Sequence, residues 1–311
     1  METTLDLSIH TEPGLPRHVA DGVERVPVIF VNAYLVGERG GPWALIDSGL
    51  PGFASRIRRA VEKRIGRDVP PQAIILTHGH FDHAGSAAEL ARYWNTTVYV
   101  HPLELPFLTG RADYPPQDPT VGGALGFLSR TFPHRGINLG DRVEALPSDG
   151  SVPGMPAWRW LHTPGHTAGH VSLFRDADRT LLAGDALATL DQDSAIAMVT
   201  QRPEFSVPPA PLTTDWDAAH RSVRRLAALR PYAVSAGHGL PVRGSRVAGD
   251  LEHFADVFSR PRKGRYVREA ARSDENGVIY LPPPVPDPLP RQLLLTGVVT
   301  AGVLVAARRR R

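Results

Sequence analysis

Short apolar runs separated by turn-forming residues dominate the chain, and this pattern is typical of short strands joined by loops. Two such runs, at 28–36 and 43–46, flank a glycine-rich turn at 37–42, so we expect a β-hairpin that ends at Asp47. Further strands are expected at 73–76, 97–100, 171–175, 180–183 and 232–235.

Three segments are expected to be helical, the first because its apolar residues recur at helical spacing. They are 53–65, 84–93 and 215–229. Strands followed by a helix thus occur twice along the chain. This order favours two similar halves over a doubly wound parallel sheet.

Two long segments, 102–140 and 189–214, show no regular period. Such segments inside a compact domain are usually functional, often as a lid, or else disordered, and we expect both to be lids. The apolar residues of the first segment either form a pocket wall, suited to an acyl chain or a hydrophobic lactone, or pack as a small local core. They are Phe107, Leu125, Phe127, Leu128 and Phe132.

Composition narrows the chemistry that the chain can perform. Its 311 residues are 42% apolar and 22% charged, an ordinary balance that permits a sizeable core. Cysteine is absent. This absence excludes a disulfide scaffold, a thiol nucleophile, a cysteine zinc finger and an iron–sulfur site.

The formal net charge of +3 depends on four arginines at 308–311. Without them, 31 basic residues face 32 acidic ones. A body with this balance lacks the positive excess typical of nucleic-acid-binding proteins. We therefore expect a small-molecule substrate and no nucleic-acid partner.

The two ends of the chain differ from its centre. An N-terminal extension, 1–24, contains acids and no apolar signal-peptide core, so we expect the catalytic domain, 25–260, to be cytoplasmic. A basic and proline-rich linker at 261–290 leads to an expected apolar helix at 291–311, in which 15 residues at 293–307 carry no charge. Because a membrane span takes about 20 residues, we expect this helix to dock or to contact a membrane surface through 292–311, with a tail anchor as the alternative.

The metal-binding signal is the sequence His78-Gly79-His80-Phe81-Asp82-His83, which directly follows a predicted buried strand. Three imidazoles and one carboxylate within six residues suit zinc or another borderline metal. The alternative is a polar turn that is rich in histidine by chance. With 13 histidines in 311 residues, that clustering is improbable.

Three later motifs are weak evidence for a metal site when taken alone. Together with the first motif they become stronger evidence, because a metal site needs ligands from distant loops. The segment 163–170 contains His166, which we choose as a ligand, whereas His162 and His170 are expected to have structural or supporting roles. Asp185 ends an apolar strand, and His238 lies between two glycines that allow close backbone approach.

The chain contains five motifs in the order Asp47-Ser48-Gly49, HGHFDH, TPGHT, AGD and GHG. Together they resemble the motifs of the metallo-β-lactamase superfamily over roughly residues 25–240. The resemblance implies an α/β fold, a four-layered αβ/βα sandwich with the metals at one edge between two sheets. It implies two metal ions, one bound by His78, His80 and His166 and the other by Asp82, His83 and His238. Asp185 would bridge both ions, and Asp47 would orient ligands from behind.

A hydrolytic mechanism follows from such a site. Two divalent ions, zinc by default with iron or manganese as alternatives, would share a water and lower its pKa toward ~7. The hydroxide would attack a carbonyl, and Asp82 or Asp185 would relay a proton to the leaving group. The expected reaction is cleavage of a thioester, a lactone or another ester.

Differences from the motifs of individual branches narrow the choice of branch within the superfamily. The bridging Asp185 argues against β-lactamase branches that lack it, and His80 stands where flavodiiron proteins carry glutamate. The glyoxalase II and lactonase branch fits best, although Ala188 occupies the position of a tyrosine in quorum-quenching lactonases. The basic stretch 260–266 is either a site for an anionic carrier, such as glutathione or coenzyme A, or a solvated loop.

Other activities are compatible with parts of the motif set. A mononuclear iron persulfide dioxygenase would use only His78, His166 and Asp185. A nuclease is disfavoured because we recognise neither an RNA-binding arm nor an inserted nuclease domain. A non-catalytic binding protein would need a lost ligand, and all seven positions are filled. The sequence leaves the oligomeric state open.

Overall fold

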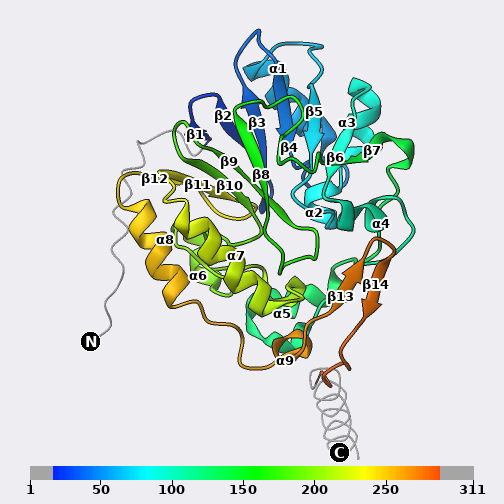
Figure 1. Ribbon diagram of the computed structural model, residues 1–311, viewed down its shortest axis with the longest axis vertical. Coiled ribbons are helices and arrows are strands. Elements are labelled where there is room, and N and C mark those ends of the chain that lie inside the picture. Colours follow the sequence, from blue (N-terminus) through cyan, green and yellow to red (C-terminus); the bar gives the residue numbers. More distant parts are fainter. Residues whose placement is uncertain (1–16, 288–311) are drawn as a thin grey trace, which may run out of the picture.

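Two β-sheets face each other, and helices cover the outer side of each (Figure 1). The structure is a computed structural model that describes residues 17–287. Its layers run helix, sheet, sheet, helix, which confirms the predicted α/β fold and the four-layered αβ/βα sandwich.

The first sheet has seven strands in chain order from β1 to β7. Strands β1 to β4 pair antiparallel, and β4 to β7 pair parallel. The strands are β1 (His18–Ala20), β2 (Val23–Val28), β3 (Val31–Gly37), β4 (Trp43–Ile46), β5 (Ala73–Ile75), β6 (Val98–Val100) and β7 (Val143–Ala145).

The second sheet has five strands in the order β12-β11-β10-β9-β8. Only the β10–β11 pair is parallel among its described pairings. The strands are β8 (Trp158–His162), β9 (Val171–Arg175), β10 (Thr180–Gly184), β11 (Ala233–Ala236) and β12 (Val242–Arg243).

Amphipathic helices form the two outer layers. Helices α1 (Ala54–Arg64) and α3 (Ala87–Trp94) lie on the first sheet, and α7 (Trp216–Ala228) and α8 (Val247–Asp256) lie on the second. In α1, Ala54, Ile57 and Val61 are buried at positions i, i+3 and i+7, the spacing that places side chains on one helix face. Asp215 caps the N-terminus of α7, and its carboxylate accepts the backbone N–H of Ala218 at 2.8 Å.

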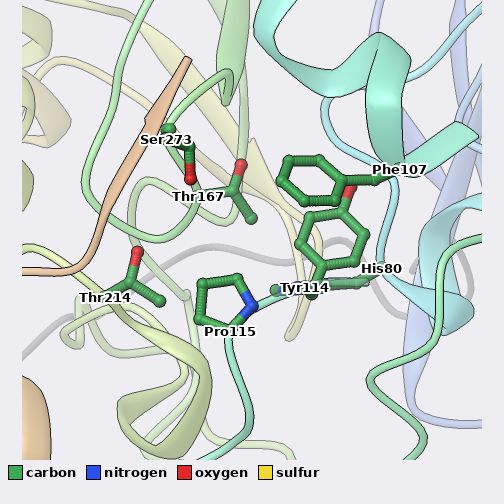
Figure 2. A pocket seen from close by; sticks show the side chains of 8 residues that line it. His80, Phe107, Tyr114, Pro115, Thr167, Thr214 and Ser273 are labelled. Carbon is green, nitrogen blue, oxygen red and sulfur yellow. The ribbon is translucent and has the colours of Figure 1, made fainter. Parts of the chain in front are cut away.

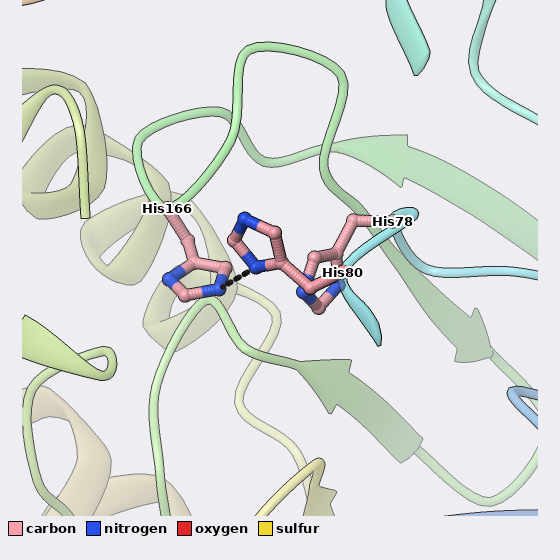
Figure 3. Close-up of side chains that lie close together, drawn as sticks. All are labelled: His78, His80 and His166. Carbon is pink, nitrogen blue, oxygen red and sulfur yellow. Dashed lines mark hydrogen bonds between the residues drawn. The ribbon is translucent and has the colours of Figure 1, made fainter. Parts of the chain in front are cut away.

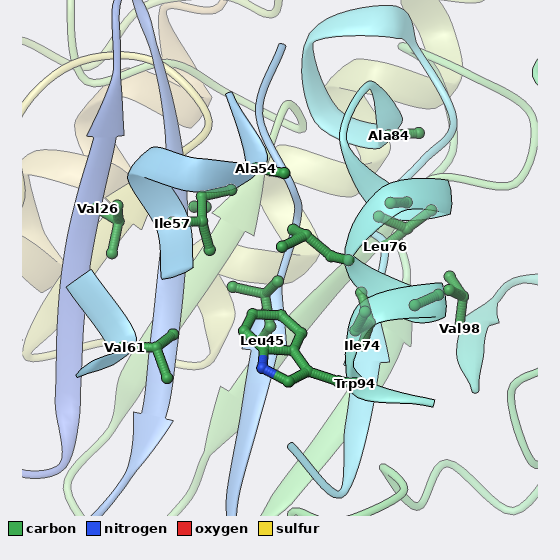
Figure 4. Close-up of a cluster of buried hydrophobic side chains, with 14 of the residues drawn as sticks. Val26, Leu45, Ala54, Ile57, Val61, Ile74, Leu76, Ala84, Trp94 and Val98 are labelled. Carbon is green, nitrogen blue, oxygen red and sulfur yellow. The ribbon is translucent and has the colours of Figure 1, made fainter. Parts of the chain in front are cut away.

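Each pair of neighbouring layers encloses its own apolar core. Figure 4 shows the core between the first sheet and its helices, in which Ile57 of α1 and Trp94 of α3 belong to one cluster with Leu45 and Ile74 of the sheet. A second cluster fills the space between the sheets, and a third lies under α7 and α8. Burial of these side chains from water is the main force that holds the layers together.

Most predicted elements are present within a residue or two of their expected ends. Strand β9 and helices α1 and α7 are clear cases. The first predicted strand, 28–36, is wrong at its start, because the chain turns at Ile29, leaving β2 before the turn and β3 after it. Ile29 has a φ of 59° there, a left-handed conformation that β-branched residues rarely adopt, so the pattern gave no sign of the turn.

Short helices lie in the two segments expected to be irregular. In the first they are η1 (Pro102–Glu104), α4 (Leu105–Leu108), η2 (Pro119–Val121), α5 (Gly123–Leu128), η3 (Ser129–Thr131) and η4 (Gly140–Arg142). In the second they are α6 (Ala195–Thr200) and η5 (Ala210–Leu212). Two remaining helices are α2 (Phe81–Ala84) and α9 (Arg265–Arg268).

A C-terminal hairpin of β13 (Arg272–Asp274) and β14 (Gly277–Tyr280) packs against the first of these segments. A Cβ atom at Gly277 would come within 2.5 Å of the Ala112 side chain, so the two backbones approach closely. The expected apolar helix at 291–311 lies outside the described residues. Among helices at 17–287, none is long and apolar enough to cross a membrane.

Candidate metal centre

Four chain segments meet at one edge of the two sheets. The loop after β5 leads into α2 with the first histidine motif, and the loop between β8 and β9 carries the second. The ends of β10 and β11 supply the third and fourth. All seven sequence-predicted ligands come together here and are buried: His78, His80, Asp82, His83, His166, Asp185 and His238.

The side chains form three groups whose potential ligand atoms lie within 4.8 Å of one another. The first group, His78, His80 and His166, is drawn in Figure 3, where His80 Nδ1 and His166 Nε2 lie 3.0 Å apart. The second group is Asp82, His83 and His238, and the third is His78, His83 and Asp185. The first and second groups are two neighbouring sets of three candidate ligands. Asp185, from the third group, is the carboxylate that both sets can share.

Asp185 lies between the two sets. Its Oδ2 atom is 3.5 Å from Nε2 of His166, which belongs to the first set. The same atom is 3.4 Å from Nε2 of His83 and 3.3 Å from Nε2 of His238, which belong to the second. One carboxylate oxygen is therefore nearly equidistant from both.

Outer hydrogen bonds orient the rings of His83 and His238 so that Nε2 of each faces Asp185. His83 Nδ1 lies 2.8 Å from Asp47 Oδ2, and His238 Nδ1 lies 2.9 Å from the Phe30 carbonyl oxygen. Both acceptors require a proton on Nδ1, so the neutral form of each ring has its lone pair on Nε2, where it can bind a cation.

The chemistry of the inner atoms fits a divalent cation. His78 Nε2, His83 Nε2 and Asp185 Oδ1 are fully buried and have no hydrogen-bond partner among the described residues. Buried polar atoms without partners are costly, and a bound ion satisfies them. Imidazole with carboxylate is a donor set for zinc, iron or manganese.

Burial sets the protonation state of the first three histidines. It lowers the pKa of His78 and of His166 well below the ordinary value, and it lowers the pKa of His80 to about 3. These imidazoles are therefore neutral near pH 7, the form that binds a metal.

The second set behaves differently because of its carboxylates. Burial favours the neutral form of His83 and His238, but the surrounding carboxylates, Asp185 foremost and Asp82 with it, together outweigh burial and raise the pKa of both rings. In turn, burial opposes ionisation of Asp185, but His238 and His83 hold its pKa well below the usual range. Burial also raises the pKa of Asp82, although the charges of His83 and His238 act to lower it.

Asp47 lies behind the cluster and is hydrogen-bonded to it. Its carboxylate accepts the backbone N–H of Thr77 at 2.8 Å and the Thr77 hydroxyl at 2.9 Å, in addition to the His83 ring. Asp47 has a φ of 57°, a left-handed conformation that Asp and Asn tolerate better than other side chains.

His170 positions the segment that carries Asp185. Its Nε2 accepts the backbone N–H of Asp185 at 2.8 Å, which occupies the lone pair that a metal would need. A Cβ atom at Gly184 would come within 2.6 Å of that nitrogen, so only glycine fits before Asp185. His162 lies outside the centre, where its ring stacks on His101 with centroids 4.2 Å apart.

A small pocket opens beside His80 (Figure 2). Apolar parts of Phe107, Tyr114, Pro115 and Ala168 line it together with three hydroxyl-bearing residues, Thr167, Thr214 and Ser273. Tyr114 comes from the first irregular segment and Ser273 from the C-terminal hairpin. Neither Tyr114 nor Ser273 could be predicted to lie at the site, because nothing in the local sequence pattern of either residue indicates a role there.

The five apolar residues of the first segment do not act as one group, either as a pocket wall or as a local core. Phe107 is buried and lines the pocket. Phe132 packs against Phe81, with ring centroids 5.5 Å apart. Phe127 and Leu128 are exposed and lie outside the pocket lining.

The basic stretch 260–266 does not reach this pocket. Arg260 pairs with Asp217 at 3.1 Å, and Arg265 donates a hydrogen bond to the Pro282 carbonyl oxygen at 2.6 Å. No residue of the stretch lines the pocket.

The sequence matches the family description "Metallo-beta-lactamase superfamily" over residues 26–238, which span all seven candidate ligands. The chain belongs to this superfamily. Among curated proteins, "Probable metallo-hydrolase YflN" of Bacillus subtilis is 42% identical over 243 residues, 77% of this chain and 92% of the relative.

Solved structures of the superfamily share the fold. A beta-lactamase domain protein from Burkholderia ambifaria superposes with a TM-score of 0.52 at 23% identity, covering 77% of this chain and 76% of that one. A B3 metallo-beta-lactamase with an active-site glutamic acid has a TM-score of 0.51 at 24% identity, covering 76% and 84%. This superfamily member therefore has metallo-hydrolase relatives and a buried His/Asp cluster that can hold metal.

Proposed function

We propose that this protein is a hydrolase that uses two divalent metal ions, zinc by preference, to cleave an ester, thioester or lactone. The position of Asp185 carries the proposal. One of its oxygens lies 3.3–3.5 Å from histidine nitrogens of both ligand sets. Such a carboxylate suits the role of a bridge between two ions.

The second ligand set favours this function over a persulfide dioxygenase. A one-iron dioxygenase of this superfamily would use His78, His166 and Asp185 alone. Here Asp82, His83 and His238 also converge, and Asp47 and the Phe30 carbonyl orient the two histidine rings. A second set held this closely supports a second ion.

Different residues of the chain would bind the metal ions and transfer the proton during hydrolysis. When bound, divalent ions supply Lewis acidity, which lowers the pKa of water and polarises a carbonyl oxygen. The neutral imidazoles of His78, His80 and His166 would hold one ion, and Asp82, His83 and His238 would hold the other. Asp82 and Asp185 are the two carboxylates that can carry a proton to the leaving group.

The pocket beside His80 supports a substrate with an uncharged acyl part. Its lining combines aromatic and aliphatic surfaces with three hydroxyl groups and, His80 apart, contains no titratable side chain other than the phenol of Tyr114. A charged group placed there would lose hydration without gaining an ion pair. Hydroxyl groups can instead donate hydrogen bonds to an ester or lactone oxygen.

A hydrolysis panel tests the proposal. The zinc-loaded protein is assayed with neutral acyl thioesters, lactones and aryl esters, and in parallel for oxygen uptake with glutathione persulfide. We expect hydrolysis of at least one neutral class, lost by at least 100-fold in Asp185→Asn. Oxygen uptake by the iron-loaded protein without hydrolysis by the zinc-loaded one would overturn it.

A further inference from the structure

Glu104 is a fully buried carboxylate beside the metal centre, and no motif of the sequence includes it. It ends η1, at the start of the irregular segment after β6. Four groups donate hydrogen bonds to it, two to each oxygen. They are the backbone N–H of Gly79 at 3.1 Å, the Tyr114 hydroxyl, the Thr167 hydroxyl at 2.6 Å and the backbone N–H of Gly169 at 3.0 Å.

These donors belong to the two loops that carry the first ligand set. Gly79 lies between His78 and His80, and Thr167 directly follows His166. Oxygen Oε2 binds the first loop through Gly79, and Oε1 binds the second through Thr167 and Gly169. One side chain thus joins the backbones of two loops that are more than eighty residues apart in sequence.

The glycines of both loops make room for this arrangement. A Cβ atom at Gly169 would lie 2.7 Å from Glu104 Cγ, and a Cβ atom at Gly79 would lie 2.4 Å from the Tyr114 hydroxyl oxygen. Both distances are shorter than real contacts allow, so a side chain at either position would displace the carboxylate or its phenol partner. The glycines between the histidines therefore serve the approach of Glu104.

Tyr114 connects the same carboxylate to the substrate pocket. Its ring packs on His80 with centroids 4.6 Å apart and stacks on Phe107 at 4.2 Å. Both aromatic residues line the pocket. The hydroxyl of Tyr114 donates a hydrogen bond to Glu104 from this side. The irregular segment 102–140 and the two ligand loops are therefore hydrogen-bonded to the same carboxylate.

We propose that Glu104 is a positioning residue that fixes the spacing of the two histidine loops and thereby sets the metal affinity of His78, His80 and His166. The inference rests on the proposed metal centre. Supporting residues around metal ligands typically change affinity by about 10- to 100-fold when they are replaced.

Glu104→Gln tests the geometry directly. Each carboxylate oxygen accepts a backbone N–H, so the amide NH₂ of glutamine must face either Gly79 or Gly169 and release one loop in either orientation. Burial raises the pKa of Glu104 and the four donors oppose that rise, but a neutral amide of the same shape breaks the contact at any pH.

The matched control is Asp118→Asn. Asp118 is another buried carboxylate, and it accepts the backbone N–H of Thr120 at 3.0 Å, its hydroxyl at 2.6 Å and the backbone N–H of Arg265. Among residues 17–287, none of these hydrogen bonds involves either histidine loop. Its replacement should lower the melting temperature and leave metal binding unchanged.

The readout is titration of the metal-free full chain with cobalt(II), followed by the visible absorption of the bound ion. We expect two cobalt ions per wild-type chain, and binding of one of them weakened by about 10- to 100-fold in Glu104→Gln. If that variant does not fold, Tyr114→Phe removes one donor and should weaken the same ion by about 2- to 10-fold.

The outcomes separate the two proposals. A wild-type chain that takes up no cobalt would overturn the metal centre itself. Wild-type binding of two ions, with unchanged isotherms in both Glu104→Gln and Tyr114→Phe, would overturn the positioning role alone. Equal weakening in Asp118→Asn would also overturn it, since any lost buried carboxylate would then have the same effect.

Discussion

Asp47 Oδ2 lies 2.8 Å from Nδ1 of His83, and the other oxygen of the same carboxylate accepts the backbone N–H of Thr77, the residue before His78. One side chain therefore fixes the orientation of a ligand ring and the start of the ligand loop. This contact places His83 Nε2 3.4 Å from Asp185.

Asp47→Asn should weaken the second ion while the backbone stays in place. Asparagine tolerates the left-handed conformation at this position, so the change removes charge and an acceptor and adds little strain. We expect about 10- to 100-fold weaker binding of one metal ion, measured by competition with a chromophoric chelator. Asp68→Asn is the control, because Asp68 also has a left-handed backbone, with a φ of 56°, and lies in an exposed turn outside the candidate ligand set. Equal affinities in the two variants would contradict the role of Asp47.

The wall formed by Ser273 should limit the length of the acyl group. Ser273→Phe narrows the pocket from the C-terminal hairpin and leaves every candidate ligand in the sequence unchanged. We expect KM to rise by about tenfold for longer acyl chains and little for acetyl substrates, because a filled pocket excludes the added methylenes. Ile279→Phe, on the same hairpin and 62% exposed, is the control. The same KM change for short and long chains would contradict a specificity wall.

His101 should make the protein less stable in mild acid. Burial, aided by His162, lowers the pKa of His101 to about 4, whereas the unfolded value is about 6.5. Between these values the unfolded chain binds more protons than the folded one, so stability falls as the pH drops from about 6.5 toward 4. His101→Asn removes this titration and keeps an acceptor at the start of η1, where His101 Nδ1 accepts the N–H of Leu103. Urea unfolding at pH 7 and pH 5 should show a smaller stability difference in the variant, and an unchanged difference would contradict the prediction.

The sequence predicts what depends on local pattern. The apolar runs at 171–175 and 180–183 become β9 and β10, and the His-Gly-His motif follows β5 as expected. The seven candidate ligands could be chosen because each lies in a motif shared with a known superfamily.

What depends on distant contacts could not be predicted. Glu104 stands in a segment without a period, and its importance arises only when the loops at Gly79 and Gly169 meet around it. Ser273 reaches the pocket because its hairpin folds back on Ala112, a contact that no local pattern indicates. The turn at Ile29 is likewise hidden, since an apolar β-branched residue favours strand over a left-handed bend.

The metal content of the purified protein tests the central claim most directly. The full chain is expressed in cells supplied with both zinc and iron, purified without added metal and analysed by plasma mass spectrometry. The bridging position of Asp185 between two ligand sets predicts two zinc ions per chain, falling to one or fewer in Asp185→Asn. One iron ion per chain with little zinc would contradict the binuclear hydrolase.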